Sequence, residues 1–350
     1  MAQTDKLRIA VDAMGSDNAP APEIAGALEA AGAEEDIDVI LVGDEKRLEA
    51  ELSRRPGRDN VSIVHASEAI TMDDSPVAGI RQKKDASLLV AMRLVKNGEA
   101  EAVVSAGNTG AVYLAARTIL GSIKGVARSA LCQQLPTTRD PVLVLDLGAN
   151  AECTARHLCE FAEMGMVYSE RALGVENPRV GLLNIGEEQL KGNELSKTVH
   201  RLLSATHHVN FIGNIEPKAM YEGVADVVVC DGFVGNVVLK TSEAAGALLK
   251  TLIARELQST LVSKVGGLLS RGAFLRLKHT VDPNEYLGAP LLGVNGVVII
   301  LHGACVARGV ANAIRGGYRA AKGEINEHIR TGIEELRSAE ASLDNEGQPT

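Results

Sequence analysis

Short apolar runs in this chain repeatedly end in turns rich in glycine, asparagine, aspartate and threonine, and most of these turns lead into helix-compatible stretches. This alternation indicates right-handed βαβ units. The predicted strands are residues 7–12, 38–42, 61–64, 103–104, 142–146, 180–183, 211–212, 227–230 and 296–301. We therefore expect an α/β fold, with an open, mostly parallel, twisted sheet and helices on both faces.

The positions between these runs predict the helices. Pro22 suits a first helical turn, because its missing N–H would have no partner there, and Asn97 with Gly98 forms a good stop. The predicted helices begin near residue 22 and then span 45–55, 85–96, 237–257, 303–314 and 319–339, with 342–350 expected to fray. No low-complexity linker interrupts the pattern. Residues 1–340 are therefore predicted to form one large α/β unit, undivided or as two lobes around a cleft.

Composition narrows the class of protein. Hydrophobic residues make up 45% of the 350 residues, but aromatics only 3%, which suits a Val, Ile, Leu and Ala core around a sheet buried on both faces. A net charge of −9 argues against nucleic-acid binding. We see no signal peptide and no 18-residue apolar run, so a cytoplasmic location is expected. Five scattered cysteines without CxxC spacing predict buried thiols rather than disulfides or a metal site.

Residues 257–281 depart from the alternating pattern. This stretch contains four basic residues and no acidic one, although the chain as a whole is acidic. Glycines at 266, 267 and 272 should bend it, so we expect a protruding, kinked helical hairpin with Lys264, Arg271 and Lys278 on one stripe. Such a basic, apolar surface suits anionic lipid or an acidic protein, while a dimer arm or a locally basic core helix is the alternative. The basic residues are Lys264, Arg271, Arg276 and Lys278.

Several standard catalytic motifs are missing from the sequence. The chain has no G-x-x-x-x-G-K-[ST] phosphate loop and no G-x-G-x-x-G dinucleotide motif. It also lacks a G-x-S-x-G turn, and no cysteine occupies a comparable position. A covalent acyl-enzyme therefore has no evident nucleophile, and the polar turns become the candidate site.

If the strands are parallel, these turns gather at their carboxyl ends, where open α/β sheets bind ligands. Residues 105–110 open a helix and could cradle an anion with Asn108, Thr109 and Gly110, because helix N-termini present unpaired N–H groups. The alternative is an ordinary turn capped by Asn108 or Thr109.

Other turns supply further candidates. Lys191 lies in a long turn after residue 183 and is either a functional cation or a solvated lysine. Asn236 could donate to a substrate oxygen, or it could cap the following helix. His302 closes the last predicted strand and is a weak candidate acid. His200, His207 and His208 are expected at the surface.

Seven stretches resemble the bacterial phosphate acyltransferases of phospholipid synthesis, the PlsX family. They are residues 11–20, 105–111, 146–150, 182–192, 230–241, 289–296 and 302–303. The resemblance extends from about residue 7 to 315. Ser16 and Leu287 stand where glycine is usual, and Ala304 and Cys305 where small polar residues are usual.

This resemblance implies transfer of a long fatty acyl group from acyl carrier protein to inorganic phosphate, by direct attack of phosphate on the thioester. The acyl phosphate would serve a membrane glycerol-3-phosphate acyltransferase. It also implies a homodimer, a fold like that of phosphate acetyltransferases and isopropylmalate-type dehydrogenases, and peripheral attachment to the inner face of the membrane. Neither a cofactor nor a metal is expected.

A chemical role follows for each candidate. Phosphate needs positioning more than deprotonation, and a thiol leaves easily, so an anion cradle, a cation and an oxyanion donor suffice. Asn108, Thr109 and Gly110 are expected to hold phosphate, Lys191 to offset its charge and Asn236 to orient the carbonyl. The expected substrate-lining residues are Asp12, Asn150, Asn193, Asn214, Asp231 and His302. The rival functions are an acyl-CoA-dependent phosphate acyltransferase and a non-catalytic membrane-surface scaffold.

Overall fold

A computed structural model describes residues 6–57 and 59–346. Its strands are β1 (Leu7–Asp12), β2 (Ile37–Gly43), β3 (Val61–His65), β4 (Ala102–Ser105), β5 (Ala130–Leu135), β6 (Val142–Leu145), β7 (Val180–Leu183), β8 (Phe211–Ile215), β9 (Val227–Val229), β10 (Ala289–Leu292) and β11 (Val297–Ile300). In this described part they form one eleven-stranded sheet in the order β3-β2-β1-β4-β11-β10-β5-β6-β9-β7-β8. All nine predicted strands are present, while β5 and β10 were not predicted.

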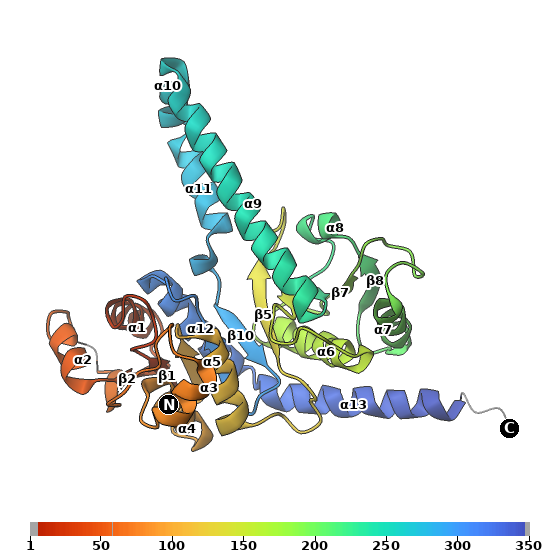
Figure 1. Ribbon diagram of the computed structural model, residues 1–350, viewed down its shortest axis with the longest axis horizontal. Coiled ribbons are helices and arrows are strands. Elements are labelled where there is room, and N and C mark those ends of the chain that lie inside the picture. Colours follow the sequence, from red (N-terminus) through yellow and green to blue (C-terminus); the bar gives the residue numbers. More distant parts are fainter. Residues whose placement is uncertain (1–5, 58, 347–350) are drawn as a thin grey trace.

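The helices flank this sheet on both faces (Figure 1). They are α1 (Ala21–Ala33), α2 (Glu45–Leu52), α3 (Pro76–Gln82), α4 (Ser87–Lys96), α5 (Thr109–Ala115), α6 (Ala155–Arg171), α7 (Glu194–Ala205), α8 (Pro217–Tyr221), α9 (Gly232–Ser259), α10 (Leu261–Leu269), α11 (Arg271–Val281), α12 (Ala307–Lys322) and α13 (Ile325–Glu346). A π-helical turn, η1 (Ala116–Leu120), continues α5, and a 3-10 turn, η2 (Pro283–Glu285), follows α11. Helices α1 and α12 pack together beside β1, whereas α6 packs between α13 and β9.

The sheet consists of two parallel halves that run in opposite directions. Strands β1, β2, β3, β4 and β11 are parallel to one another, as are β6, β7, β8 and β9. The unpredicted strands β10 and β5 join them, and each pairs antiparallel to both neighbours. The expectation that all polar turns share one edge is therefore wrong. We call the carboxyl ends of β1, β4 and β11 the first edge, and those of β6, β7, β8 and β9 the second edge.

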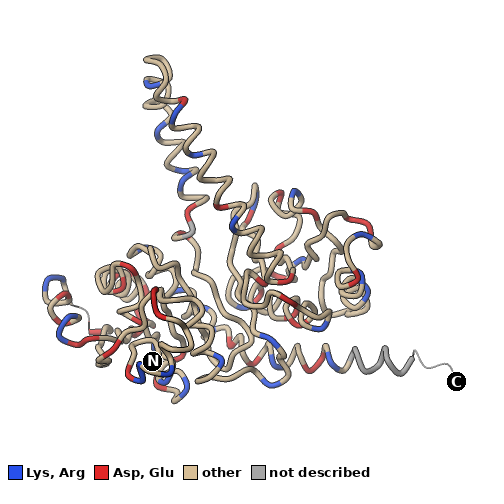
Figure 2. Tube along the Cα trace, viewed as in Figure 1, with Lys and Arg blue, Asp and Glu red and all other residues tan. Residues whose placement is uncertain are grey.

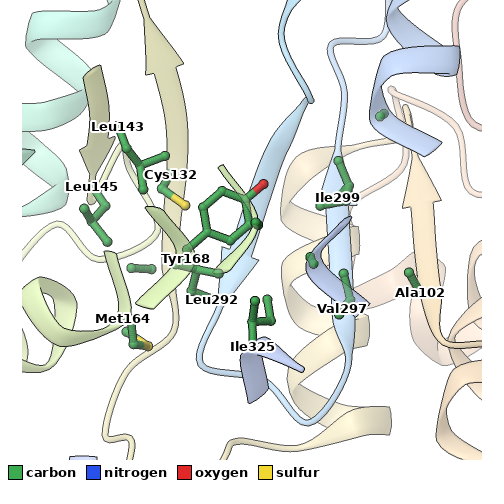
Figure 3. Packing of buried hydrophobic residues seen from close by; sticks show 14 of the residues in the cluster. Ala102, Cys132, Leu143, Leu145, Met164, Tyr168, Leu292, Val297, Ile299 and Ile325 are labelled. Carbon is green, nitrogen blue, oxygen red and sulfur yellow. The ribbon is translucent and has the colours of Figure 1, made fainter. Parts of the chain in front are cut away.

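One apolar core runs through both halves. Strands β4, β6, β7 and β11 are buried at every position, as expected for strands covered on both faces. Tyr168 and Leu292 lie in the middle of this core, between side chains of β6 and of β11 (Figure 3). The five cysteines remain thiols, four of them buried, in agreement with the composition.

The C-terminal helices differ from those predicted. Residues 303–306 form a turn, so α12 begins at Ala307 rather than at 303, and it continues to Lys322. Gly323 and Glu324, which has a positive φ of 48°, separate α12 from α13. Helix α13 runs to Glu346, past residue 342, where fraying is predicted to begin. Residues 347–350 lie outside the described part.

A long arm, residues 243–281, projects from the body and consists of the outer part of α9 together with α10 and α11 (Figure 1). The hairpin expected at 257–281 is present. The chain turns back at Thr260, an extended residue between α9 and α10, while Ser270 separates α10 from α11, and Gly266 and Gly267 are helical. Lys264 therefore lies on a different helix from Arg271 and Lys278, and the predicted single stripe is wrong. None of the helices in the described part is both long and apolar enough to cross a membrane.

Candidate active site

Asp12 ends β1 at the first edge, and both of its carboxylate oxygens accept internal hydrogen bonds. Its Oδ1 accepts from Ser87 Oγ at 2.6 Å, and its Oδ2 accepts from Ser105 Oγ at 2.7 Å. Burial raises the pKa of this carboxyl above its usual range. A Cβ on Gly15 would lie 2.7 Å from Asp12 Oδ2, so the turn packs directly on the carboxylate. Asp12 thus organises the first edge from within.

Asn108 caps α5, as the alternative interpretation of this turn proposed. Its Oδ1 accepts from Ala111 N at 3.1 Å, and its Nδ2 donates to the carbonyls of Met72 and Asp74 at 3.2 and 3.3 Å. The carboxamide is therefore committed to structure. Thr109 and Gly110 are exposed, and their backbone N–H groups begin the helix, where no intrahelical acceptor reaches them. The donors that this turn offers an anion are these two amides.

His302 lies at the same edge, exposed, in the turn after β11. Its Nδ1 accepts a hydrogen bond from Ala304 N at 3.1 Å, which leaves the proton of the neutral ring on Nε2. The following residue, Gly303, is buried, and a Cβ there would lie 3.0 Å from Asp17 Oδ1. The ring is available for a ligand, although its Nδ1 already has a structural role.

Asp146 and Asn150 lie at the second edge, in the turn after β6. The carboxylate of Asp146 accepts from five donors, namely the backbone N–H groups of Leu131, Gly148, Ala149 and Asn150 and the Nδ2 of Asn150. Asn150 Nδ2 also donates to Ser129 O at 2.8 Å. Both side chains are buried. Asn150, a predicted substrate-lining residue, therefore has its amide group committed to the turn.

Asn236 lies on the first turns of α9, but it does not cap the helix. The N-cap is Asp231, whose Oδ1 accepts from Val234 N at 2.9 Å. The Asn236 carboxamide is exposed and lies over the Asp146 turn, because a Cβ on Gly148 would be 3.4 Å from its Cγ. Within the described residues it makes no hydrogen bond. Asn236 is therefore free to bind a ligand at the second edge.

Lys191 is exposed in the turn between β7 and α7. Among the described residues, no carboxylate forms an ion pair with it. The next polar residue, Asn193, caps α7 by accepting from Ser196 N at 2.9 Å. Buried Asn214 donates from its Nδ2 to Glu188 O at 2.9 Å, so it supports the turn that carries Lys191.

The candidate residues thus fall into two groups. Strands β6, β9 and β7 are neighbours, so their turns place an uncommitted amide (Asn236) and an uncommitted cation (Lys191) at one edge. The first edge holds Asp12, Asn108, Thr109, Gly110 and His302. No hydrogen bond or ion pair in the described part of the chain joins the two groups.

Comparison with known proteins identifies the family. Residues 7–328 match the family described as "Fatty acid synthesis protein". The "Phosphate acyltransferase" of Moorella thermoacetica is 47% identical over 333 residues, 95% of this chain and 96% of that protein. The "Phosphate acyltransferase" of Citrifermentans bemidjiense is 45% identical over 344 residues, 98% of this chain and 97% of that one. The chain belongs to this family.

Solved structures confirm the fold expected for this phosphate acyltransferase family. EutD phosphotransacetylase from Staphylococcus aureus has a TM-score of 0.60 at 17% identity, covering 91% of this chain and 95% of that one. A branched-chain phosphotransacylase from Enterococcus faecalis V583 has a TM-score of 0.53 at 14% identity, covering 89% and 98%. At these identities the likeness concerns the fold alone.

Two features of this family member were not found from its sequence. His200, expected at the surface, is buried against Phe211, with ring centroids 5.3 Å apart, and lines a groove of about 490 Å³ beside α7. Glu23 in α1 is 1% exposed, and neither of its carboxylate oxygens has a hydrogen-bond partner within the described residues. Burial raises its pKa to about 7. A single glutamate in a helical segment gives no indication in the sequence that its carboxyl is buried.

Proposed function

We propose that the protein transfers a long-chain fatty acyl group from the thioester of acyl carrier protein to inorganic phosphate, giving acyl phosphate for phospholipid synthesis. Family membership supports phosphate acyltransfer in lipid synthesis. The observation that carries the assignment to a site is that an uncommitted cation, Lys191, and an uncommitted carboxamide, Asn236, follow the neighbouring strands β7 and β9 at the second edge.

In the proposed reaction, a phosphate oxygen attacks the thioester carbonyl carbon and forms the new C–O bond. Asn236 Nδ2 donates to the carbonyl oxygen as it becomes negative, and the Lys191 ammonium offsets the charge of phosphate and of the tetrahedral intermediate. The C–S bond then breaks, the electron pair leaves with sulfur, and the proton carried by hydrogen phosphate goes to the leaving thiolate, which gives the free thiol. No general base is required, because phosphate is already an anion.

The thiols of the site do not suit a covalent alternative. Cys153 and Cys230 flank the turn after β6, but burial raises the pKa of Cys153 to about 11 and that of Cys230 well above its usual range. A thiol that stays protonated is a weak nucleophile. This favours direct attack by phosphate.

We propose that the backbone amides of Thr109 and Gly110 bind the same phosphate whose charge Lys191 offsets. They belong to the first edge, whose strands run opposite to those of the second. Sheet twist of roughly 20–25° per strand pair rotates β4 relative to β9 by roughly 100–125° over five steps. Opposite strand directions therefore do not by themselves keep the two edges on opposite sides of the molecule. His302 and Asp231 are proposed to line the same substrate space.

The test is release of free thiol from palmitoyl-carrier protein in the presence of phosphate. We expect Lys191→Ala and Asn236→Ala each to lower kcat by a factor on the order of 10²–10³, because each removes one preorganised group at the developing charge. Lys197→Ala removes a partly exposed lysine on α7 that pairs with Glu194; it is the matched control and should retain normal turnover. Near-normal rates for both site variants, with folding confirmed by circular dichroism, would overturn the assignment.

Two rival functions are separated by the same assay. An acyl-CoA-dependent enzyme would prefer palmitoyl-CoA over the carrier-protein donor at equal concentration. A non-catalytic scaffold would release no thiol with either donor. We expect turnover with the carrier-protein donor.

We propose that the arm contacts an acidic partner, either the membrane surface or acyl carrier protein, at the inner face of the membrane. Figure 2 shows Lys and Arg along both of its returning helices. Lys264, Arg271, Arg276 and Lys278 are all exposed there, beside exposed apolar side chains such as Leu261 and Leu269. Basic charge next to exposed apolar surface is the pattern that adsorbs to anionic lipid.

Charge reversal tests this surface. With Lys264, Arg271 and Lys278 changed to Glu, flotation with anionic liposomes should be lost, and wild-type binding should weaken with added salt. The matched control reverses Lys46 and Arg47 of α2 together with Arg54, which follows this helix, at a part of the body away from the arm (Figure 1). If the triple variant floated with liposomes as wild type does, the proposed membrane contact would be wrong. If its KM for acyl carrier protein were unchanged, the proposed docking of the carrier on the arm would be wrong.

A homodimer and delivery of acyl phosphate to a membrane glycerol-3-phosphate acyltransferase complete the proposal, on the strength of the family resemblance. Sedimentation equilibrium of the full chain tests the first, and co-flotation with that acyltransferase in proteoliposomes tests the second.

A further inference from the structure

A buried asparagine bonds both ends of the turn that carries Lys191. Asn184 directly follows β7, and its backbone N–H donates to Ile215 O at 2.9 Å, which fixes it in the sheet. Its side-chain Oδ1 accepts from Ile185 N at 2.8 Å, and its Nδ2 donates to Lys191 O at 3.2 Å. The backbone of Lys191 is therefore tied to the end of β7.

A second buried asparagine holds the middle of the same turn. Asn214 lies opposite Leu182 in the β7–β8 register, and its Nδ2 donates to Glu188 O at 2.9 Å. Its Oδ1 is buried without a hydrogen-bond partner in the described residues, which normally costs about 1–3 kcal/mol. Because this cost is tolerated, we take the Nδ2 of Asn214, which holds Glu188 O, to be the part of the amide that the turn requires.

Two glycines let the turn close on these side chains. Gly192 has a φ of 89°, and a Cβ there would lie 2.5 Å from Asn184 Oδ1, so a larger residue would displace Asn184. A Cβ on Gly186 would lie 2.9 Å from Lys191 Cγ. The aliphatic part of Lys191 therefore rests on Gly186, and both its backbone and its side chain are guided.

We infer that Asn184 and Asn214 are positioning residues for Lys191 in the reaction proposed above. The inference rests on that proposed function, because it takes the Lys191 ammonium as the group that offsets the reacting charge. A displacement of about 1 Å in a positioned group can cost a factor of about 10² in rate. Asn214, expected from the sequence to bind substrate, acts instead through the turn, and Asn184 was not a candidate.

A double-mutant cycle tests the inference. Asn184→Ala should lower kcat roughly 10- to 100-fold with little change in KM for the carrier-protein donor, and should have no further effect in a Lys191→Ala background. Asn184→Asp, which keeps the acceptor for Ile185 N but loses the donor to Lys191 O, should lie between wild type and Asn184→Ala. Gly186→Ala displaces the Lys191 side chain without removing a hydrogen bond, and should also lower kcat only while Lys191 is present.

Asn210→Ala is the matched control. Its Nδ2 donates to Asn177 O at 3.0 Å, the same kind of bond at the opposite ends of β7 and β8. This variant should keep the wild-type kcat.

Amide hydrogen exchange of residues 185–191 supplies a readout that is independent of turnover, and it should accelerate in Asn184→Ala and in Asn214→Ser. Additive effects of Asn184→Ala and Lys191→Ala on kcat would overturn the positioning role while leaving the proposed function intact. Unchanged exchange would overturn the hydrogen-bonded turn itself. A wild-type protein without turnover would overturn the proposed function and, with it, positioning for catalysis.

Discussion

The first and second edges of the sheet present similar polar turns, but their side chains are used differently. At the first edge, Asp12 and Asn108 spend their hydrogen-bonding capacity on the protein itself. At the second edge, Asp146 does the same, while Lys191 and Asn236 remain uncommitted among the described residues. The two halves are related in architecture, yet the uncommitted cation and carboxamide both lie at the second edge, while the first edge offers the Nε2 of His302.

The difference shows how a polar residue in a turn should be interpreted. A buried polar group must be paired or it costs stability, so Asp12 and Asp146 are structural parts of their turns. A polar side chain without a hydrogen-bond partner in an exposed turn does not stabilise the fold, and it is available to bind a ligand. Function is therefore best sought among the groups that the fold does not use.

The largest expected effect concerns Asp12. Asp12→Ala should lower the free energy of unfolding by about 3–5 kcal/mol, because it leaves the buried hydroxyls of Ser87 and Ser105 without their acceptor. Asp231→Ala, which removes only an N-cap, should cost about 1 kcal/mol. Urea unfolding followed by far-UV circular dichroism measures both, since the chain has no tryptophan. Equal costs would contradict the view that the first edge is organised from within.

The next effect concerns Glu23, behind the first edge. Its pKa of about 7 lies above the usual value of an unfolded glutamate, so the folded protein binds this proton more tightly than the unfolded chain does. The resulting stabilisation is fully present below pH ~4.5 and is lost as pH rises through 7. Glu23→Gln should abolish this loss, and at pH 8 should be more stable than wild type by about 3 kcal/mol. Exposed Glu34, at the end of the same helix, is the control. Parallel pH–stability curves for wild type and Glu23→Gln would show that Glu23 ionises normally.

A smaller effect on stability distinguishes Asn108 at the first edge from Asn236 at the second. Asn108→Ala should cost about 2 kcal/mol of stability, because it removes a cap and leaves two carbonyls without a donor. Asn236→Ala should leave stability within about 0.5 kcal/mol of wild type while lowering kcat. The same unfolding and thiol-release assays apply. If Asn108→Ala were as stable as wild type and its turnover no longer depended on phosphate concentration, Asn108 would bind phosphate rather than hold the turn, and the comparison of the two edges would be reversed.

The smallest effect lies away from both edges. His208 Nε2 lies 2.7 Å from Oε2 of buried Glu163, and this hydrogen bond raises the pKa of His208. Its contribution is fully present below the unfolded pKa of about 6.5 and is lost as pH rises through the folded value. His208→Asn should therefore be less stable than wild type by about 1 kcal/mol at pH 5.5 and by less at pH 9. A pH-independent difference would show that the pair is not ionic.

The strands could be predicted because buried parallel strands are continuous apolar runs, as in β6 and β7. The two missed strands are of another kind. β10 includes Pro290, which is unusual inside a sheet, and β5 mixes buried and half-buried positions, including two glutamines. Because these two strands reverse the direction of the sheet, missing them led to the wrong expectation of a single ligand-binding edge.

Within the candidate site, the sequence identified the turns but not the state of each side chain. Asn108 is committed through Met72 and Asp74, which lie more than 30 residues away in the chain, so no local pattern reveals these bonds. Asn214 and Glu188 are 26 residues apart, so their bond is equally hidden from local sequence patterns. Lys191 could be singled out because its turn follows a buried strand, whereas its lack of an ion pair became visible only in three dimensions.

Helix α9 connects Asn236 near its base to the arm tip without interruption. At 1.5 Å per residue, the 23 positions from Asn236 to Ser259 span about 35 Å. An α-helix of this length acts as a strut, so any surface on which the tip rests is held at this height from Asn236. In the function proposed above, this gap would admit a small folded carrier between the protein and the lipid, and the acyl phosphate would have to cross it to reach a bilayer.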